Sequence, residues 1–350
     1  MSDPPEHDLV VLMRLGTVTL DRVRDAADLR RSLRGRLPAT DAVIVKPNWY
    51  SPHPANFTDA HALGLLMDAV DARFTVVEGH SLDRQDGSLR YTVDGEEVDW
   101  RWIMRHPDWS WIMEDGRLER LRAQERWFMD AHGFTDLLDA HDAEYVNVTE
   151  EIWGGRALDP RIVQEKVESV YPPARSREVY GFMPRRLADM EGSTLISLGR
   201  VKGYGGAYPS LTVKNMFGLI PDPMRSWWHG PEDSRLSDSI VDAVKLYASY
   251  FSLYGICEAF RNLTVSDPQG EVKTSWGCYG VREVESFAVH GPNLIDVDAV
   301  TCGLIDVEPG KVVYISEGEK AFGPYDRDAC LRAAANRGRY TSPRGGMVKP

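Results

Sequence analysis

LISLGRVKGYGGAYPSLTVKNMFGLIPDP, residues Leu195–Pro223, joins a buried strand to a group of basic residues. The apolar residues at its start predict a strand, and Arg200 and Lys202 follow at its end, before a glycine-rich turn. Lys214–Asn215 lies farther on, in a short apolar segment. Cations and glycines at the end of a buried strand are typical of anion sites in α/β proteins. The stretch also suits a sharp turn with solvated basic side chains, so by itself it leaves both interpretations open.

The segment DAVIVKPNWY (Asp41–Tyr50) ends a second predicted strand in the same way. Its β-branched run stops at Lys46, and the proline that follows prevents a central strand from continuing. Lys46 and Asn48 are therefore expected at the end of this strand.

FTVVEGH (Phe74–His80) ends a third predicted strand with Glu78 and His80. The carboxyl ends of parallel neighbouring strands meet at one edge of a sheet. If the three strands are neighbours, their polar residues converge on one site; these are Lys46, Asn48, Glu78, His80, Arg200 and Lys202. The pattern predicts where a site lies and leaves its reaction open.

Composition and charge restrict the class of protein. The chain has 350 residues, 43% of them hydrophobic, which is enough for a large buried core. Its net charge of -12 argues against nucleic acid as a partner, because polyphosphate is repelled, but it is compatible with a local basic site for a small anion. No apolar run is long enough to span a bilayer, and the acidic start MSDPPEHD has no secretory leader. We therefore expect a cytoplasmic protein.

Strand and helix patterns alternate along much of the chain. Strands are predicted at Leu9–Leu15, Val43–Lys46, Phe74–Glu78, Glu144–Val148, Leu253–Glu258, Leu263–Val265, Val284–Val289 and Val312–Ile315. Helices are predicted at Asp21–Arg34, from an N-cap at Thr58–Asp59 to Val70, and at Phe134–Ala140, Ser234–Tyr250 and Asp298–Leu304. This alternation predicts an α/β fold with a mainly parallel central sheet flanked by helices, organised as one elaborated domain over residues 1–350.

Two regions depart from the alternation. Residues 91–130 are rich in tryptophan and charge, with a hairpin turn at Asp94–Gly95. We expect a lid-like insertion there, whose tryptophans either form an aromatic wall over the site or pack on the main core. Residues 253–323 are expected to form a second, smaller lobe.

Cysteines and acidic residues give little support for a metal centre. Cys257, Cys278, Cys302 and Cys330 lie far apart, without a Cys-x-x-Cys pair, so we expect reduced thiols and no iron–sulfur or zinc site. Oxygen ligands for magnesium are available at Glu78, Asp83, Asp296, Asp298 and Glu317. Carboxylates at strand and helix ends are also ordinary caps, and Asp298 is predicted to cap the helix that follows it. We expect no cofactor, and magnesium remains the open alternative.

Five short motifs in a fixed order resemble a known family. They are KPN (Lys46–Asn48), VVEGHS (Val76–Ser81), SLTVKNMFGLIP (Ser210–Pro221), NLIDVDAV (Asn293–Val300) and VYISEGEKAFG (Val313–Gly323). Together they resemble the family named domain of unknown function three-sixty-two, and the KN-x-x-GLIP element is the most specific of them. The resemblance implies no particular reaction. Many members carry a ferredoxin-type cluster domain, whose cysteine spacing this chain lacks.

The chain departs from the family pattern at polar positions. Members usually show a Lys-x-Lys-Thr-His-like segment before the KN element, where this chain has Arg200-Val-Lys202-Gly-Tyr204. Members tend to have Gly-Asp-Ser where this chain has Glu78-Gly-His80-Ser. Roles for these residues are therefore inferred from their own chemistry.

The residues favour a cofactor-independent enzyme of bacterial specialised metabolism that acts on a small metabolite with an amine and an anionic group. We place Lys46, Glu78 and His80 in catalysis. We expect the substrate and its anion to be bound by Asn48, Arg200, Lys202, Tyr204, Lys214, Asn215 and His229. Cations stabilise the charge that develops on a departing sulfate or phosphate, and Glu78, His80 or Asp83 binds the amine or accepts its proton. This suits an intramolecular displacement or elimination that closes an aziridine-like ring.

Two other functions remain open. The chain could be a redox or electron-transfer component that works with an iron–sulfur or flavin partner, or a non-catalytic anion-binding subunit. A small partner protein or a second copy of the chain could complete the site. For the enzyme, we expect Lys46→Ala and Lys202→Ala to abolish turnover with little change in thermal stability.

Overall fold

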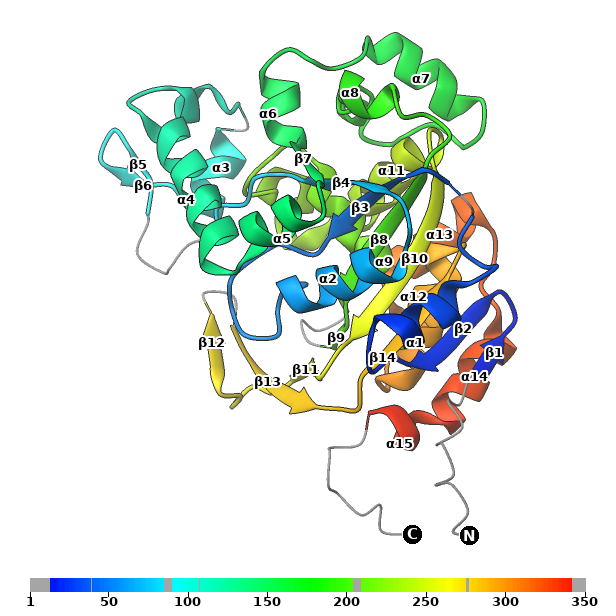
Figure 1. Cartoon of the computed structure of the whole chain (residues 1–350). Coiled ribbons are helices and arrows are strands. Elements are labelled where there is room, and N and C mark those ends of the chain that lie inside the picture. Colours follow the sequence, from blue (N-terminus) through cyan, green and yellow to red (C-terminus); the bar gives the residue numbers. More distant parts are fainter. Residues whose placement is uncertain are drawn as a thin grey trace, which may run out of the picture.

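A computed structural model of the protein describes residues 13–38, 40–84, 90–106, 108–203, 209–274 and 277–341. Its central sheet has eight strands in the order β1-β2-β14-β10-β8-β3-β4-β7 (Figure 1). Their bounds are β1 (Met13–Leu15), β2 (Val18–Arg22), β3 (Ala42–Pro47), β4 (Arg73–Glu78), β7 (Glu144–Asn147), β8 (Thr194–Arg200), β10 (Ser252–Ala259) and β14 (Phe287–Gly291).

Five of these strands run in parallel. β10, β8, β3, β4 and β7 are parallel neighbours, and β14, β2 and β1 extend the sheet with antiparallel pairs. The predicted α/β fold with a mainly parallel central sheet is therefore confirmed. The three strands with polar ends, β8, β3 and β4, are direct neighbours, with Lys46 of β3 opposite Ser197 of β8. Their carboxyl ends share one edge of the sheet, where open α/β sheets usually bind ligands.

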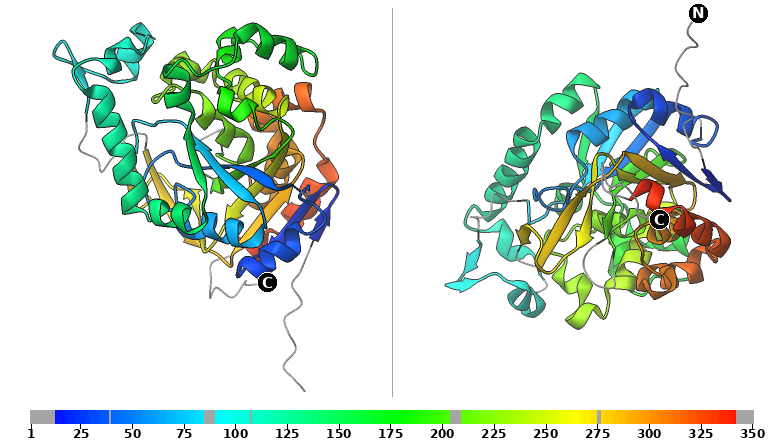
Figure 2. Two further views of the ribbon diagram at one scale, coloured as in Figure 1. Left: turned by 45° about the horizontal axis from the view of Figure 1, so that its top comes forward. Right: turned by 90° about the horizontal axis from the view of Figure 1, so that it is seen from below.

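Helices cover both faces of the sheet because its side chains alternate between two cores. Val43 and Val45 of β3 belong to one core, and Ile44 belongs to the other. The first core includes residues of α1 (Ala26–Leu33), α2 (Ala60–Ala69), α4 (Arg117–Ala131) and α5 (Phe134–Ala140). The second includes residues of α7 (Pro160–Glu168), α9 (Thr212–Asn215), α11 (Leu236–Ala248), α12 (Leu294–Leu304), α13 (Val313–Phe322) and α14 (Arg327–Ala335). The two layers of helices lie on opposite sides of the strands (Figure 2).

Shorter helices connect these elements. The α-helices are α3 (Trp100–Arg105), α6 (Val148–Trp153), α8 (Arg185–Ala188), α10 (Ser226–His229) and α15 (Arg337–Tyr340). The 3₁₀ helices are η1 (Ser110–Met113), η2 (Arg177–Gly181), η3 (Met216–Leu219), η4 (Pro231–Asp233) and η5 (Pro309–Lys311).

One predicted helix cap is confirmed and another is wrong, although a side chain caps both helices. The Asp59 side chain accepts a hydrogen bond from the backbone N–H of Ala62 and caps α2, as predicted. The predicted N-cap at Asp298 is wrong: α12 begins earlier, after Asn293, and Asp298 lies buried in its middle. The strand predicted at Val312–Ile315 is also wrong, because this segment starts helix α13.

A small sheet continues from the carboxyl ends of β8 and β10. Its strands, in the order β12-β13-β11-β9, are β9 (Lys202–Gly203), β11 (Asn262–Ser266), β12 (Val272–Thr274) and β13 (Gly277–Glu283). Residues 253–323, for which a smaller lobe is predicted, thus supply strands to both sheets and helices α12 and α13 to the main core.

The tryptophan-rich insertion, residues 91–130, has a hydrophobic cluster of its own. The predicted turn at Asp94–Gly95 joins β5 (Thr92–Val93) to β6 (Glu96–Glu97), and this hairpin projects from one side of the molecule with α3 (Figures 1 and 2). Trp102 and Trp111 are buried in the cluster, against which Met224 packs from the main domain. The insertion therefore contacts the segment that follows η3, and its role as a lid stays a prediction.

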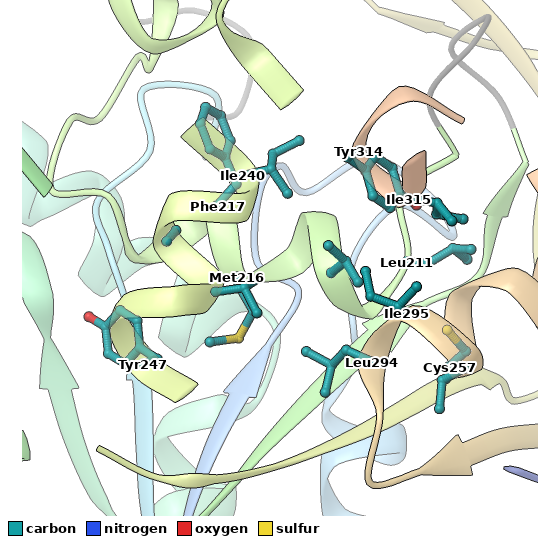
Figure 3. Packing of buried hydrophobic residues seen from close by; sticks show 14 of the residues in the cluster. Leu211, Met216, Phe217, Ile240, Tyr247, Cys257, Leu294, Ile295, Tyr314 and Ile315 are labelled. Atoms are coloured by element: carbon teal, nitrogen blue, oxygen red, sulfur yellow. The ribbon is translucent and has the colours of Figure 1, made fainter. Parts of the chain in front are cut away.

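The segment α9–η3, which carries the KN element, is buried deeply in the second core. Leu211, Met216 and Phe217 lie among apolar side chains of α11, α12, α13 and β10 (Figure 3). Asp298 of α12 accepts hydrogen bonds from the backbone N–H groups of Thr212 (2.8 Å) and Val213 (2.9 Å), which satisfies the start of α9. This packing holds the KN element rigidly at the edge of the sheet.

Candidate functional site

A cavity of about 250 Å³ lies at the carboxyl ends of β3, β4 and β8. It is lined by Lys46, Asn48, Trp49, Tyr50, Glu78, Lys202, Ser210, Lys214, Asn215, Phe217, Gly218, Met224, Arg225 and His229. Seven of the predicted site residues, from four separate segments, are therefore brought together. The convergence expected from parallel strand ends is what the topology produces.

Lys46 and Glu78 form a buried ion pair in this cavity. Their side chains are 1% and 2% exposed, and Lys46 Nζ donates to Glu78 Oε2 over 2.7 Å. Lys46 Nζ also donates to the Pro47 carbonyl (2.7 Å) and to Asn215 Oδ1 (3.1 Å). An ammonium group has three N–H donors, so these contacts use all of them.

Glu78 is held by the backbone as well as by Lys46. Its Oε2 accepts from the Trp49 N–H (3.1 Å) and its Oε1 from the Gly79 N–H (3.0 Å). A carboxylate can accept about four hydrogen bonds. One acceptor position on Oε1 is therefore left for a ligand.

Asn215 and Asn48 connect this pair to Lys202. Asn215 Oδ1 accepts from Asn48 Nδ2 (3.1 Å), and Asn48 Oδ1 accepts from Lys202 Nζ (2.7 Å). Asn215 Nδ2 donates to the Lys46 carbonyl (2.8 Å), which ties the KN element to the end of β3. Sequence separation of more than 150 residues between these partners explains why spacing alone could not predict the contacts.

Burial lowers the pKa of all three lysines of the cavity. Burial lowers the pKa of Lys46 to about 8, although Glu78 opposes the shift. Burial also lowers the pKa of Lys214 to about 8, against the opposing effect of Asp233. Burial, followed by repulsion from Lys214 and Lys46, lowers the pKa of Lys202 well below its usual value. A bound anion would relieve this repulsion, which is the behaviour expected of an anion site.

Arg225 and Gly218 also line the cavity; Gly218 belongs to the KN-x-x-GLIP element, whereas the sequence did not single out Arg225. Arg225 is 5% exposed, and its Nη2 donates to the carbonyls of Gly218 (2.8 Å) and His80 (3.2 Å). Its backbone is left-handed (φ 60°), a conformation that costs energy for a residue of this size. A Cβ on Gly218 would lie 2.7 Å from both Lys46 Nζ and Glu78 Oε1, so glycine is required for the close packing here.

Two predicted site residues are buried away from the cavity lining. His80 is 1% exposed and lies between Glu125 (2.8 Å) and Glu150 (2.9 Å). Burial lowers its pKa, but the two carboxylates outweigh burial and raise it. Arg200 is 1% exposed and forms an ion pair with Glu258 (3.0 Å). Both residues therefore have structural partners, and the direct contact with substrate predicted for them has no support in this geometry.

His80 and Arg200 were predicted from their positions after strand ends. His80 lies two residues beyond the end of β4, and Arg200 is the last residue of β8, two residues before Lys202. Carboxylates from other segments hold both side chains away from the cavity lining, so proximity in sequence did not decide where they point. Tyr204, the remaining predicted ligand, lies outside the described residues.

His229 and Lys214 border the cavity from the side of α9 and α10. His229 Nδ1 lies 2.8 Å from Asp233 Oδ1, and its ring packs edge-on against Phe217. Burial lowers the pKa of His229 despite Asp233. A mainly neutral imidazole at this position can bind a ligand without adding a full charge.

The acidic candidates for magnesium are dispersed. Asp298 holds the start of α9, Asp296 accepts from the Asp326 N–H (3.0 Å), and Glu317 pairs with Lys320 (2.6 Å). In the described part of the chain, no group of three or more histidine, cysteine, aspartate or glutamate residues could hold a metal ion. The magnesium alternative therefore stays a prediction.

The cysteines are separate free thiols, three of them buried. Burial raises the pKa of Cys257 and Cys302 well above the usual value, so these thiols are unreactive. A redox role would depend on a partner and stays a prediction.

The motifs, the parallel sheet and the cavity can be compared with known proteins. The family model for Domain of unknown function (DUF362) matches residues 43–270, more than half of the chain. The chain belongs to this family. All the residues that line the cavity fall within the matched region.

One curated relative and the solved structures complete the comparison. A thylakoid-associated protein of Synechocystis sp. is 30% identical over 136 residues, which cover 37% of this chain and 38% of that protein. The chain thus matches well under half the length of this relative. No solved structure matches. Within the described residues, no helix combines the length and the apolar character needed to cross a membrane.

Proposed function

We propose that this protein is an enzyme that binds a small metabolite with an anionic group and an amine, and displaces the anion to close a ring. The observation that carries the proposal is the convergence of Lys46, Lys202 and Lys214 on one buried cavity that also contains Glu78. The chain as a whole is acidic, so these cations are a local feature.

The cost of burying the cations supports a functional role. Cations lose solvation when they are buried, and this lowers the pKa of Lys202 and Lys214; repulsion from Lys214 and Lys46 lowers the pKa of Lys202 further. Structural lysines are normally paired or exposed. Lys202 donates to two neutral acceptors, Asn48 Oδ1 and the Asn56 carbonyl, so an anionic substrate would supply its counter-charge. A departing sulfate or phosphate would be stabilised further as its charge develops.

Glu78 is suited to receive the amine. Its open acceptor position on Oε1 can hydrogen-bond the substrate nitrogen and take a proton from it. In the proposed step the amine nitrogen attacks the carbon that bears the ester oxygen, so a C–N bond forms as the C–O bond breaks. The electron pair of the C–O bond leaves with the sulfate or phosphate beside Lys202, and the amine proton passes to Glu78. Holding nitrogen, carbon and leaving group in line contributes up to roughly 7–11 kcal/mol.

Anion binding and turnover can be measured separately. Calorimetric titration with sodium sulfate is expected to show one site, weakened at least about tenfold by Lys202→Met or Lys214→Met because each removes a cation. Lys320→Met is the matched control, since it removes the same charge from an exposed lysine that pairs with Glu317. Equal affinity in all four proteins would refute the site.

Incubation with 2-aminoethyl hydrogen sulfate, followed by NMR and sulfate analysis, tests the chemistry. The proposed enzyme releases sulfate and aziridine faster than the Glu78→Gln variant does. Binding with full recovery of the sulfate ester would instead favour the non-catalytic anion-binding subunit.

A further inference from the structure

The polar groups of the cavity form a continuous row with a cation at each end. Lys202 donates to Asn48, which donates to Asn215, and Asn215 accepts from Lys46. Lys46 then pairs with Glu78. Gly218 lies close to this pair, because a Cβ added to it would lie 2.7 Å from both Lys46 Nζ and Glu78 Oε1, and its carbonyl accepts a hydrogen bond from Arg225. The order along the row is therefore Lys202, the two asparagines, the Lys46–Glu78 pair and Arg225.

In the middle of the row, Glu78 can accept a hydrogen bond from a ligand, but Lys46 has no N–H group left to donate to one. The three N–H groups of Lys46 are used by Pro47, Glu78 and Asn215. The open position on Glu78 Oε1 suits a positively charged group of a ligand, such as an ammonium. Lys46 therefore holds Glu78 in place and makes no direct contact with the ligand.

The Lys202 end retains a donor for an anion. Lys202 Nζ donates to Asn48 Oδ1 (2.7 Å) and to the Asn56 carbonyl (3.2 Å), which accounts for two of its three N–H groups. Lys214 adds positive charge from the same cavity wall, as its effect on Lys202 shows. Two ammonium groups at this end suit an ester anion such as phosphate or sulfate.

The Arg225 end retains a second, separate donor. Among the described residues, Nε of Arg225 has no hydrogen-bond partner although the side chain is 95% buried, while Nη2 contacts two backbone carbonyls. Asp222 accepts from the Arg225 backbone N–H (2.7 Å) and Asp83 lies nearby, so acidic groups partly balance this guanidinium. A buried N–H without a partner costs free energy unless a ligand satisfies it, and a planar carboxylate matches a guanidinium well.

We infer that the cavity takes a ligand with two anionic groups on either side of an ammonium group, namely an α-amino acid that carries a phosphate or sulfate ester on its side chain. The ester binds beside Lys202 and Lys214, the ammonium binds Glu78, and the carboxylate binds Arg225. This assignment rests on the proposed function, because it names the substrate class of the same site.

Three probes that differ by one group each test the assignment. O-phospho-L-serine carries all three groups, phosphoethanolamine lacks the carboxylate, and 3-phosphoglycerate has a hydroxyl in place of the amine. Calorimetric titration of the wild-type protein is expected to give a Kd for O-phospho-L-serine at least about tenfold lower than for either analogue. Arg225→Met should bring O-phospho-L-serine and phosphoethanolamine within about threefold of each other, whereas Lys202→Met should weaken both by a similar factor.

The outcomes separate this inference from the proposed function. Phosphoethanolamine binding as tightly as O-phospho-L-serine overturns the carboxylate site and leaves the anion-and-amine site standing. Equal binding of 3-phosphoglycerate and O-phospho-L-serine overturns the ammonium site. If all three probes bind no more tightly than inorganic phosphate, the proposed function is overturned as well. Because the wild-type comparison decides each point, the conclusion does not depend on the folding of the Arg225→Met variant.

Discussion

Replacing Lys46 with methionine is expected to destabilise the protein strongly, because Lys46 compensates a buried carboxylate. Glu78 is 1% exposed and would keep only two backbone N–H donors, with Arg84 at 3.7 Å as the next cation. Breaking a buried pair by removing one partner typically costs 3–5 kcal/mol. We expect a loss of about 4 kcal/mol in the free energy of unfolding, which is a large part of the stability of an ordinary protein.

A double-mutant cycle gives this prediction its internal control. Glu78→Gln keeps an acceptor for Lys46 but removes the negative charge, so we expect a loss of about 2 kcal/mol. Lys46→Met combined with Glu78→Gln removes both charges and should lie within about 2 kcal/mol of the wild-type protein, since no unpaired ion remains. The two single losses sum to about 6 kcal/mol, so the coupling between the two positions is at least about 4 kcal/mol.

Urea denaturation at pH 7, followed by tryptophan fluorescence, measures the four proteins. Lys320→Met, which breaks an exposed pair, should change stability by less than about 1 kcal/mol. Additive losses in the double variant, or a loss below about 1 kcal/mol for Lys46→Met, would show that Lys46 does not stabilise Glu78. The sequence led us to expect that Lys46→Ala leaves thermal stability nearly unchanged. From the contacts of Lys46 we expect a large loss of stability instead.

Two further predictions concern pH and close packing. Because burial lowers the pKa of Lys46 and Lys214 to about 8, the unfolded chain binds more protons than the folded one between about pH 8 and the ordinary value of 10.5, so these groups make the free energy of unfolding rise with pH across that window. Sulfate binds the protonated lysines, so its affinity should fall as pH rises through about 8, and binding at pH 8 should take up protons. Calorimetry in two buffers of different ionisation enthalpy measures the proton uptake. An affinity that stays constant from about pH 7 to 9 contradicts the prediction. Gly218→Ala places a Cβ 2.7 Å from Lys46 Nζ and Glu78 Oε1 and should cost about 1–3 kcal/mol in urea denaturation together with most sulfate binding. Gly181→Ala, whose added Cβ meets only Pro160 at 4.0 Å, is the control and should be close to neutral; equal effects of the two changes would argue against the tight packing at Gly218.

Local patterns were sufficient for most of the central sheet and for its direction. The apolar runs that end at Lys46 and Glu78 predicted β3 and β4, and Asp59 predicted the start of α2, because each signal lies within a few neighbouring residues. Val312–Ile315 was misjudged because a short apolar run fits a strand and a buried helix equally well. Asp298 was misjudged for a related reason: its partners at Thr212 and Val213 are more than 80 residues away, so its sequence neighbourhood resembled a cap.

The sequence alone determined that three strands would deliver polar residues to one edge of a parallel sheet, and so it predicted Lys46, Asn48, Glu78 and Lys202 together. Only the tertiary structure decided which polar residues face the cavity. His80 and Arg200 have the same chemical character as the residues that line it, but carboxylates from α4, α6 and β10 pair with them in the interior. Arg225, which no motif marked, enters the cavity because the packing of α9–η3 places the following loop beside Glu78. Strand direction is encoded locally, whereas the partner of a buried charge depends on segments that meet only when the chain folds.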